Sequence, residues 1–132
     1  MGVILDTCIW IDVERGSLSP ADVQSKTGNE PVFMSPITIA ELSFGLENAA
    51  TPDIRQKRVA ALERLRKKPF LVIDDETGIV FGNLAATLRR QGRDARFRIQ
   101  DLWIASQAIQ HNCPVLTRNR KDFEDIPGLQ LL

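Results

Sequence analysis

The residues best placed to do chemistry in this sequence are acids that interrupt apolar patterns. The first is Asp6, which follows the branched apolar run Val3-Ile4-Leu5 without a break. The run predicts a short buried strand, and Asp6 stands where that strand ends. In open α/β sheets, ligands bind at the carboxyl ends of the parallel strands. We therefore expect the Asp6 carboxylate to face a crevice rather than bulk water.

Two further acids lie on the apolar stripes of predicted helices. Glu41 comes four residues after Ile37 and three before Phe44, a spacing that places all three on one buried helix face. Asp101 comes three residues before Ile104, on the buried stripe of a later helix. Carboxylates are almost never fully buried unless they are paired or bind a metal. Both acids therefore need an explanation.

Each of the three acids has a structural explanation. Asp6 could accept backbone N–H groups in the following turn, Glu41 could pair with an arginine, and Asp101 could cap its own helix. Together these explanations are less attractive, because all three acids are expected at one edge of the sheet. Carboxylates at one site repel one another. A hard divalent cation with oxygen ligands relieves that repulsion, so the acids favour Mg²⁺ or Mn²⁺.

A fourth ligand is expected after the fourth predicted strand, residues 115–117. Asn119 offers a neutral oxygen close to the strand end, and Asp122 offers a charge about one helical turn later. This strand should neighbour the first strand at a topological switch point, which would bring either side chain near Asp6. Asp122 is equally explained as a solvated acid beside Lys121. This reasoning leaves the choice between the two open.

Strands that alternate with helices must position these acids. Apolar runs predict strands at residues 3–5, 32–34, 70–73 and 115–117, with a short fifth at 129–131. An apolar helical turn follows residue 7 and a short helix follows Pro20, and longer helices are predicted over about 37–48, 53–67, 75–91 and 99–110. The alternation predicts an α/β fold, with a mainly parallel sheet of four to five strands flanked by helices.

Composition restricts the classes of function. The 132 residues are 43% hydrophobic and 26% charged, which is typical of one soluble globular domain spanning residues 1–132. No apolar run is long enough to cross a membrane, and the first residues lack a signal-peptide pattern, so we expect a cytoplasmic protein. The formal net charge is zero. Any nucleic-acid binding must therefore come from local basic patches.

Histidine and cysteine are too few for several kinds of site. The single histidine, His111, excludes a ribonuclease with two catalytic histidines and a histidine-rich zinc site. It lies where a helix should end, and a basic residue is favoured there. Cys8 and Cys113 form neither a disulfide framework nor a paired metal-ligand spacing. Catalysis must therefore rest on carboxylates.

Local positive charge lies close to the acids in the sequence. Arg93 and Arg98 belong to a basic run that leads to the third acid, and Arg118 follows the fourth strand. Phosphate binding is one interpretation of these residues, and a solvated face is the other. The hydroxyls of Thr7 and Thr117 could likewise donate to phosphate or cap the strand ends. All five are candidate substrate contacts.

The ordered set of motifs resembles the PIN-domain ribonucleases, and within them the VapC-type toxins of toxin–antitoxin pairs. No single motif is specific, but together they cover nearly the whole chain in order. The matching segments are Val3-Ile4-Leu5-Asp6-Thr7, Ser35-Pro36-Ile37-Thr38-Ile39-Ala40-Glu41-Leu42 with Gly45, Asp101-Leu102-Trp103-Ile104-Ala105, and Thr117-Arg118-Asn119-Arg120-Lys121-Asp122-Phe123 with Ile126-Pro127-Gly128-Leu129.

The resemblance implies a three-layer PIN-like fold and an endoribonuclease that needs Mg²⁺ or Mn²⁺. The first three acids of the family fall on Asp6, Glu41 and Asp101. The fourth often lies where this chain has Asn119, and Asp122 would compensate. The resemblance also implies a homodimer, and inhibition by a cognate antitoxin whose C-terminal segment lies in the active cleft.

The predicted reaction is metal-assisted hydrolysis of RNA phosphodiester bonds, in which one or two ions activate water and stabilise charge. Asp6 and Asp101 would be the primary ligands, and Glu41 would bind a metal or position the water. Aromatic residues are scarce, with Phe97 and Trp103 the nearest to the basic run. We therefore expect recognition of the RNA backbone and shape rather than extended base stacking.

Other classes of protein remain as alternatives. A phosphotransferase of the haloacid-dehalogenase kind would need a second acid two residues after Asp6, where this chain has Cys8. A phospho-accepting receiver domain would use Asp74 or Asp75 after the third strand, but its required lysine is not evident. A binding module that kept the fold and lost the metal is favoured only by Asn119.

Overall fold

A short parallel sheet forms the centre of the protein, seen here in a computed structural model that describes residues 2–93 and 98–132. Its strands are β1 (Val3–Leu5), β2 (Val32–Phe33) and β3 (Val115–Leu116), in the order β2-β1-β3. Both neighbours of β1 run parallel to it. The expected adjacency of the first strand and the strand at 115–117 is therefore confirmed.

The sheet is extended at each edge by a single parallel bridge. Met34 pairs with Phe70, and Leu131 pairs with Val115. The predicted strands at 70–73 and 129–131 thus keep their places but form no ladder among the described residues. In the first case the next donor opposite the Leu71 carbonyl would be residue 36, which is a proline and has no N–H. The Leu71 carbonyl instead accepts Gln107 Nε2 at 2.5 Å.

Helices connect and cover the strands. They are α1 (Thr7–Arg15), α2 (Pro20–Thr27), α3 (Pro36–Glu47), α4 (Pro52–Leu65), α5 (Asp75–Arg90) and α6 (Ile99–Gln110), followed by the 3₁₀ turn η2 (Arg120–Asp122). The longer helices match their predicted ranges closely, but α1 has nine residues where one turn was expected. Within the described ranges, no helix is long and apolar enough to span a membrane.

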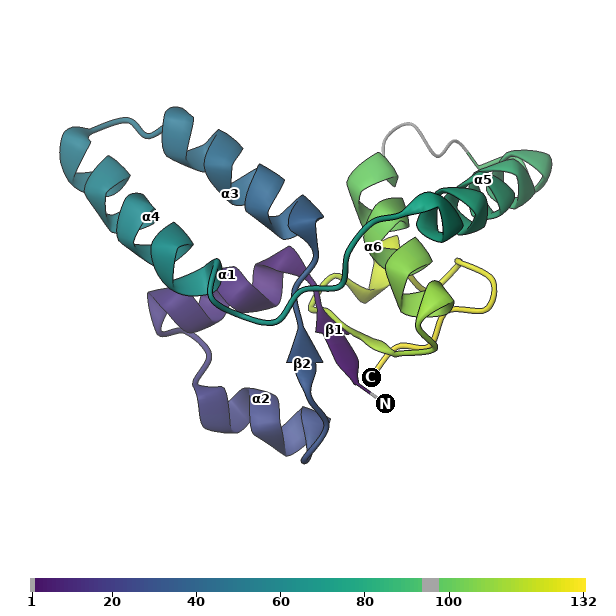
Figure 1. Ribbon diagram of the computed structural model, residues 1–132, viewed down its shortest axis with the longest axis horizontal. Coiled ribbons are helices and arrows are strands. Elements are labelled where there is room, and N and C mark those ends of the chain that lie inside the picture. The colour runs from purple at the N-terminus through teal and green to yellow at the C-terminus, as the bar shows by residue number, and fades with distance from the viewer. Residues whose placement is uncertain (1, 94–97) are drawn as a thin grey trace.

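The sheet separates two apolar clusters, which makes the molecule three-layered as predicted (Figure 1). Alternate residues of a strand point to opposite faces. Ile4 and Val115 face α5, α6 and the C-terminal segment, where they pack among Leu84, Leu88, Leu102, Ile104, Ala105, Ala108, Phe123 and Ile126. Val3, Leu5 and Leu116 face the other way, among Ile9, Trp10, Val23, Met34 and Leu65.

Helices α3 and α4 form a hairpin that projects from the body of the molecule (Figure 1). Phe44, predicted to lie on the buried face of α3, is instead 73% exposed. That prediction was wrong because the far half of α3 packs against α4 alone rather than against the sheet. Arg58 and Arg55 of α4 donate to the carbonyls of Gly45 and Leu46, which holds the hairpin together.

Candidate active site

Asp6 connects the end of β1 to the start of α1. Its carboxylate is 4% exposed. Oδ1 accepts the backbone N–H of Thr7 at 2.8 Å, and Oδ2 accepts the hydroxyl of Thr117 at 2.8 Å and the thiol of Cys8 at 3.4 Å. Hydrogen bonds to an ionised acceptor are short and strong. Asp6 therefore caps α1, and its carboxylate is fixed by donors from α1 and from the segment after β3.

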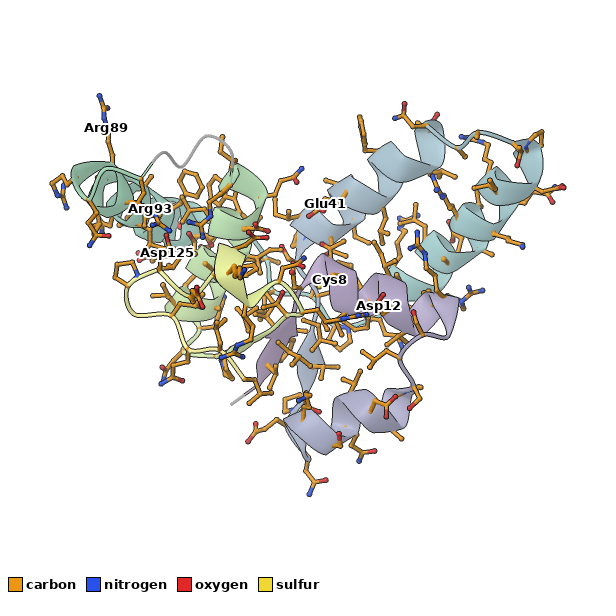
Figure 2. The ribbon with its side chains drawn as sticks, turned by 180° about the vertical axis from the view of Figure 1, so that it is seen from behind. Cys8, Asp12, Glu41, Arg89, Arg93 and Asp125 are labelled. Atoms are coloured by element: carbon orange, nitrogen blue, oxygen red, sulfur yellow. The ribbon has the colours of Figure 1, made fainter. Side chains whose placement is uncertain are left out.

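Glu41 lies on the near half of α3, where it is half-buried and turned towards the start of α1 (Figure 2). Its Oε1 accepts the hydroxyl of Thr7 at 3.1 Å. Burial raises the pKa of Glu41, the Thr7 hydrogen bond opposes that shift, and the charge of Asp6 adds to it. Glu41 makes no ion pair with an arginine anywhere in residues 2–93 and 98–132. Within those residues, the hydrogen bond from Thr7 is what holds Glu41.

Asp101 lies in the first turn of α6 and is half-buried. The cap position of this helix is Arg98, and no side chain caps it, so Asp101 does not act as the cap. Burial raises the pKa of Asp101 to about 7, and the charges of Asp6, Asp122 and Glu41 contribute to that rise in this order. Arg98 acts in the opposite direction. The four acids from four segments thus share one electrostatic environment.

The two candidates for the fourth position differ in what they do. Asp122 is exposed in η2, and its charge acts directly on Asp101. Asn119 is also exposed, and its backbone N–H donates to the Thr117 hydroxyl at 3.0 Å. Asn119 thereby supports the threonine that bonds Asp6. The charge at this end of the site comes from Asp122.

The acids provide the donor type that Mg²⁺ or Mn²⁺ prefers, since both are hard ions that take oxygen ligands. In the present arrangement, however, no three acidic, histidine or cysteine side chains of the described residues lie close enough together to hold one ion. Ion binding by three carboxylates would therefore require side-chain rotations. The exposed and half-buried positions of Asp122, Glu41 and Asp101 leave room for such rotations.

Known proteins resemble this chain in both sequence and fold. A family profile of the PIN domain matches residues 3–129. The chain belongs to the PIN-domain family. Among relatives of this PIN domain, Ribonuclease VapC5 of Mycobacterium tuberculosis is 36% identical over 126 residues, which cover 95% of this chain and 87% of that protein. Ribonuclease VapC of Rickettsia bellii is 30% identical over 133 residues, which cover 100% and 96%.

Solved structures resemble the PIN domain over its whole length. The structure of VapBC-1 from nontypeable Haemophilus influenzae is 30% identical, with a TM-score of 0.82 over 100% of this chain and 97% of that chain. DNA-bound VapBC from Salmonella typhimurium is 25% identical, with a TM-score of 0.84 over the same shares. The PIN-like fold predicted from the sequence is therefore confirmed.

Most of the arginines considered for substrate binding are engaged within the PIN domain. Asp125 accepts Arg98 Nη1 at 2.9 Å and also pairs with Arg93, which lies beside it in Figure 2. Arg118 pairs with Asp12 at 2.5 Å. The side chains of Arg93 and Arg118 are still 52% and 60% exposed. Both can therefore exchange a carboxylate partner for a phosphate.

The remaining aromatic and basic candidates have local roles or cannot be placed. Trp103 stacks on Phe81 with ring centroids 4.1 Å apart, which joins α6 to α5. Arg96 and Phe97 lie outside the described residues. His111 is the C-cap of α6, as expected for a basic residue at a helix end. No new chemistry is assigned to any of them.

The position considered for a receiver domain is occupied by a helix cap. Asp74 is the N-cap of α5, and its Oδ1 accepts the backbone N–H of Thr77 at 3.1 Å. The same oxygen accepts Gln110 Nε2 at 2.9 Å. These donors lower the pKa of Asp74. A cap with this many partners is a structural residue rather than a phosphate acceptor.

Sequence reasoning missed three side chains around the acids: Thr38, Cys8 and Asp125. Thr38 had a usable signal, since it lies three residues before Glu41 on the same helix face. Cys8 was considered only as a disulfide or metal-ligand candidate, whereas its Sγ contacts both Asp6 and Thr117. Asp125 had no local signal, because its partner Arg98 is 27 residues away.

Proposed function

We propose that this PIN domain is a metal-dependent endoribonuclease that acts as the toxin of a toxin–antitoxin pair. The observation that carries the proposal is the convergence of acids from separate segments, because Thr7 bonds both Asp6 and Glu41 and the charges of both reach Asp101. Two relatives bear the name Ribonuclease VapC or VapC5. A similar solved structure is described as a member of the VapBC family of toxin–antitoxin systems. These names support the activity and the type of partner.

Asp6, Glu41, Asp101 and Asp122 are the proposed catalytic acids, with Mg²⁺ or Mn²⁺ as the ion. Asp6 and Asp101 would hold it, Glu41 would bind it or orient the water, and Asp122 rather than Asn119 would complete the acidic set. When bound, such an ion lowers the pKa of water and stabilises charge on phosphate oxygens. Hydrolysis then breaks one P–O bond, and water supplies the new oxygen on phosphorus and a proton to the leaving oxygen.

The two threonines of the site serve the acids rather than the substrate in this proposal. The hydroxyl of Thr117 is committed to Asp6, and that of Thr7 to Glu41. Arg93 and Arg118 are the proposed phosphate contacts, since both are more than half exposed. Arg98 is less accessible, with a side chain 19% exposed, and would act mainly through its charge.

We further propose that residues 1–132 form one nuclease domain that works in the cytoplasm as a homodimer and is inhibited by a cognate antitoxin. The solved VapBC complexes that this chain resembles support a protein partner, and three exposed apolar side chains are candidate contacts for one. Phe44 on α3, Val72 before α5 and Ile79 on α5 are 73%, 63% and 58% exposed.

The experiment that tests the activity is RNA cleavage by the purified chain, freed of any bound partner. Mg²⁺, Mn²⁺ and EDTA are compared, together with an Asp101→Asn variant. Asp75→Asn, an exposed acid of α5 remote from the site, is the matched control. We expect metal-dependent cleavage that Asp101→Asn abolishes and Asp75→Asn retains. Absence of both cleavage and metal binding would favour a non-catalytic binding module instead.

A further inference from the structure

Thr38 is a fully buried polar residue to which the proposed reaction assigns no role. It lies in the first turn of α3 and is 0% exposed. Its hydroxyl oxygen lies 2.8 Å from the hydroxyl oxygen of Thr7 on α1. Threonines inside helices commonly bond a carbonyl of the preceding turn. In Thr38 the hydroxyl instead joins two helices.

The direction of this hydrogen bond follows from the number of hydrogens. The hydroxyl of Thr7 carries one hydrogen, and it donates that hydrogen to Oε1 of Glu41 at 3.1 Å. An ionised carboxylate accepts only. Thr7 must then be the acceptor in its contact with Thr38. The result is a relay of two hydroxyls in which Thr38 donates to Thr7 and Thr7 donates to Glu41.

The relay joins the two acids that come from different elements. The backbone N–H of Thr7 donates to Oδ1 of Asp6 at 2.8 Å, and its side chain donates to Glu41. Thr38 and Glu41 share one face of α3, because they are three residues apart. A donor to Thr7 also polarises its hydroxyl and strengthens the bond that it makes onward. Thr38 thus fixes the orientation of the Thr7 hydroxyl, and Thr7 is the residue that bonds both Asp6 and Glu41.

We propose that Thr38 is a positioning residue for Glu41, acting through Thr7. The inference rests on the proposed nuclease function. Thr38 touches neither substrate nor ion. It holds the Thr7 hydrogen on Glu41, so that the carboxylate keeps one orientation relative to Asp6.

Replacing Thr38 tests the relay. Thr38→Val keeps the shape and removes the donor. We expect kcat for RNA cleavage to fall about tenfold, with KM changed by less than about twofold. Affinity for Mn²⁺, measured by calorimetry without RNA, should fall by about the same factor. Thr38→Ser should restore both to within about threefold of the original chain, because it returns the hydroxyl.

A double-mutant cycle separates positioning from packing. In a Thr7→Val background the relay is already broken, so adding Thr38→Val should change Mn²⁺ affinity by less than about twofold. Thr77→Val is the matched control, since Thr77 of α5 is also 0% exposed. Its hydroxyl donates to Gln110, which lies at the opposite end of α6 from Asp101. Its loss should lower stability and leave kcat and Mn²⁺ affinity unchanged.

The outcomes discriminate between the two proposals. Unchanged kcat and Mn²⁺ affinity in Thr38→Val would overturn the positioning role, as would equal effects in both backgrounds or failure of Thr38→Ser to restore affinity. If Thr38→Val does not fold, Thr38→Cys replaces it, and its weak S–H donor should give intermediate Mn²⁺ affinity. If the original chain binds Mn²⁺ with an affinity that depends on Thr38 and cleaves no RNA, the nuclease function fails and the positioning role stands.

Discussion

Asp101 shows at the scale of one residue how the site opposes the stability of the fold. Burial and three neighbouring carboxylates raise its pKa from an ordinary 3.8 to about 7. The folded chain therefore resists ionising a group that ionises freely when unfolded. A cation that binds the carboxylates would remove this disadvantage. The same repulsion that destabilises the fold would favour the binding of a cation by these carboxylates.

Because the pKa of Asp101 is higher in the folded chain than in the unfolded chain, the metal-free protein should lose stability as pH rises from about 4 to about 7. Below pH 4 Asp101 is protonated in both states, and above pH 7 it is ionised in both, so its destabilising effect is constant there. Asp101→Asn should remove the effect. At pH 8 in EDTA we expect it to stabilise the fold by about 1–2 kcal/mol, a figure reduced for solvent screening of a half-exposed group.

Thermal unfolding at pH 4 and pH 8 measures this difference. The stabilisation should be present at pH 8 and absent at pH 4. Asp75→Asn, which changes an exposed acid in the first turn of α5, should give no stabilisation at pH 8. Equal melting temperatures for Asp101→Asn and the original chain at pH 8 would contradict the linkage.

Asp122 and Asn119 can be separated by their charge. The charge of the Asp122 side chain raises the pKa of Asp101, whereas Asn119 contacts the site through its backbone N–H. Replacing the side chain of Asp122 should therefore affect catalysis more than replacing that of Asn119. We expect Asp122→Asn to lower kcat at least about tenfold and Asn119→Ala to lower it less than about threefold. Steady-state cleavage assays measure both. The reverse order would assign the fourth position to Asn119.

At the scale of elements, local patterns in the sequence located the helices and the acids that they carry. The spacing of Glu41 and Asp101 placed each on the correct helix face, because helical periodicity is a local property. Phe44 was placed on the wrong face, because periodicity does not show that the far half of α3 projects away from the sheet. The strand at 70–73 pairs at one bridge only, and the Leu71 carbonyl accepts a hydrogen bond from Gln107, 36 positions away.

The supporting contacts of the site could not be predicted in the same way. Arg98 and Asp125 are 27 residues apart, and Thr7 and Thr38 are 31 apart. A single sequence carries no periodic signal for such pairs. What was recognisable is therefore the set of acids, and what was missed is the network of hydrogen bonds and charges that orients them.

Asp125 is predicted to hold the start of α6 in place. It accepts Arg98, the cap residue of that helix, whose buried Nε and Nη2 have no other partner among the described residues. Asp125→Ala would leave this guanidinium without its carboxylate. We expect the free energy of unfolding to fall by about 1–3 kcal/mol, measured by urea denaturation.

The pair of Asp12 with Arg118 is the matched comparison. The side chains of Asp12 and Asp125 are similarly buried, at 17% and 20% exposed. Their partners differ, because the side chain of Arg118 is 60% exposed and that of Arg98 is 19% exposed. An exposed arginine regains water when it loses its partner. Asp12→Ala should therefore cost less than about 1 kcal/mol. Equal losses in the two variants would show that the burial of Arg98 is unimportant.

At the scale of the whole molecule, a net charge of zero limits how RNA is held. Most of the arginines near the acids are already paired with carboxylates, so few phosphates can be neutralised. For three or four contacts with a single strand, the slope of log K against log salt should be about −2 to −3. Binding of RNA to a cleavage-inactive Asp101→Asn variant across a salt series measures it.

Two controls interpret the slope. Arg118→Gln should make it shallower by somewhat less than 1, if Arg118 exchanges Asp12 for a phosphate. Asp12→Ala should increase the affinity, because it frees the same guanidinium. A slope much steeper than −3 would mean that more of the surface contacts RNA than the arginines beside the acids.

Helix α4 has a consequence for how such proteins diverge. Leu65 is its only buried side chain, so most of its residues can be substituted at little cost in stability. None of the four acids lies on it. Substitutions along α4 can therefore change the exposed surface of the molecule while the four acids stay in place. Related chains can differ along this helix and still keep the same carboxylates.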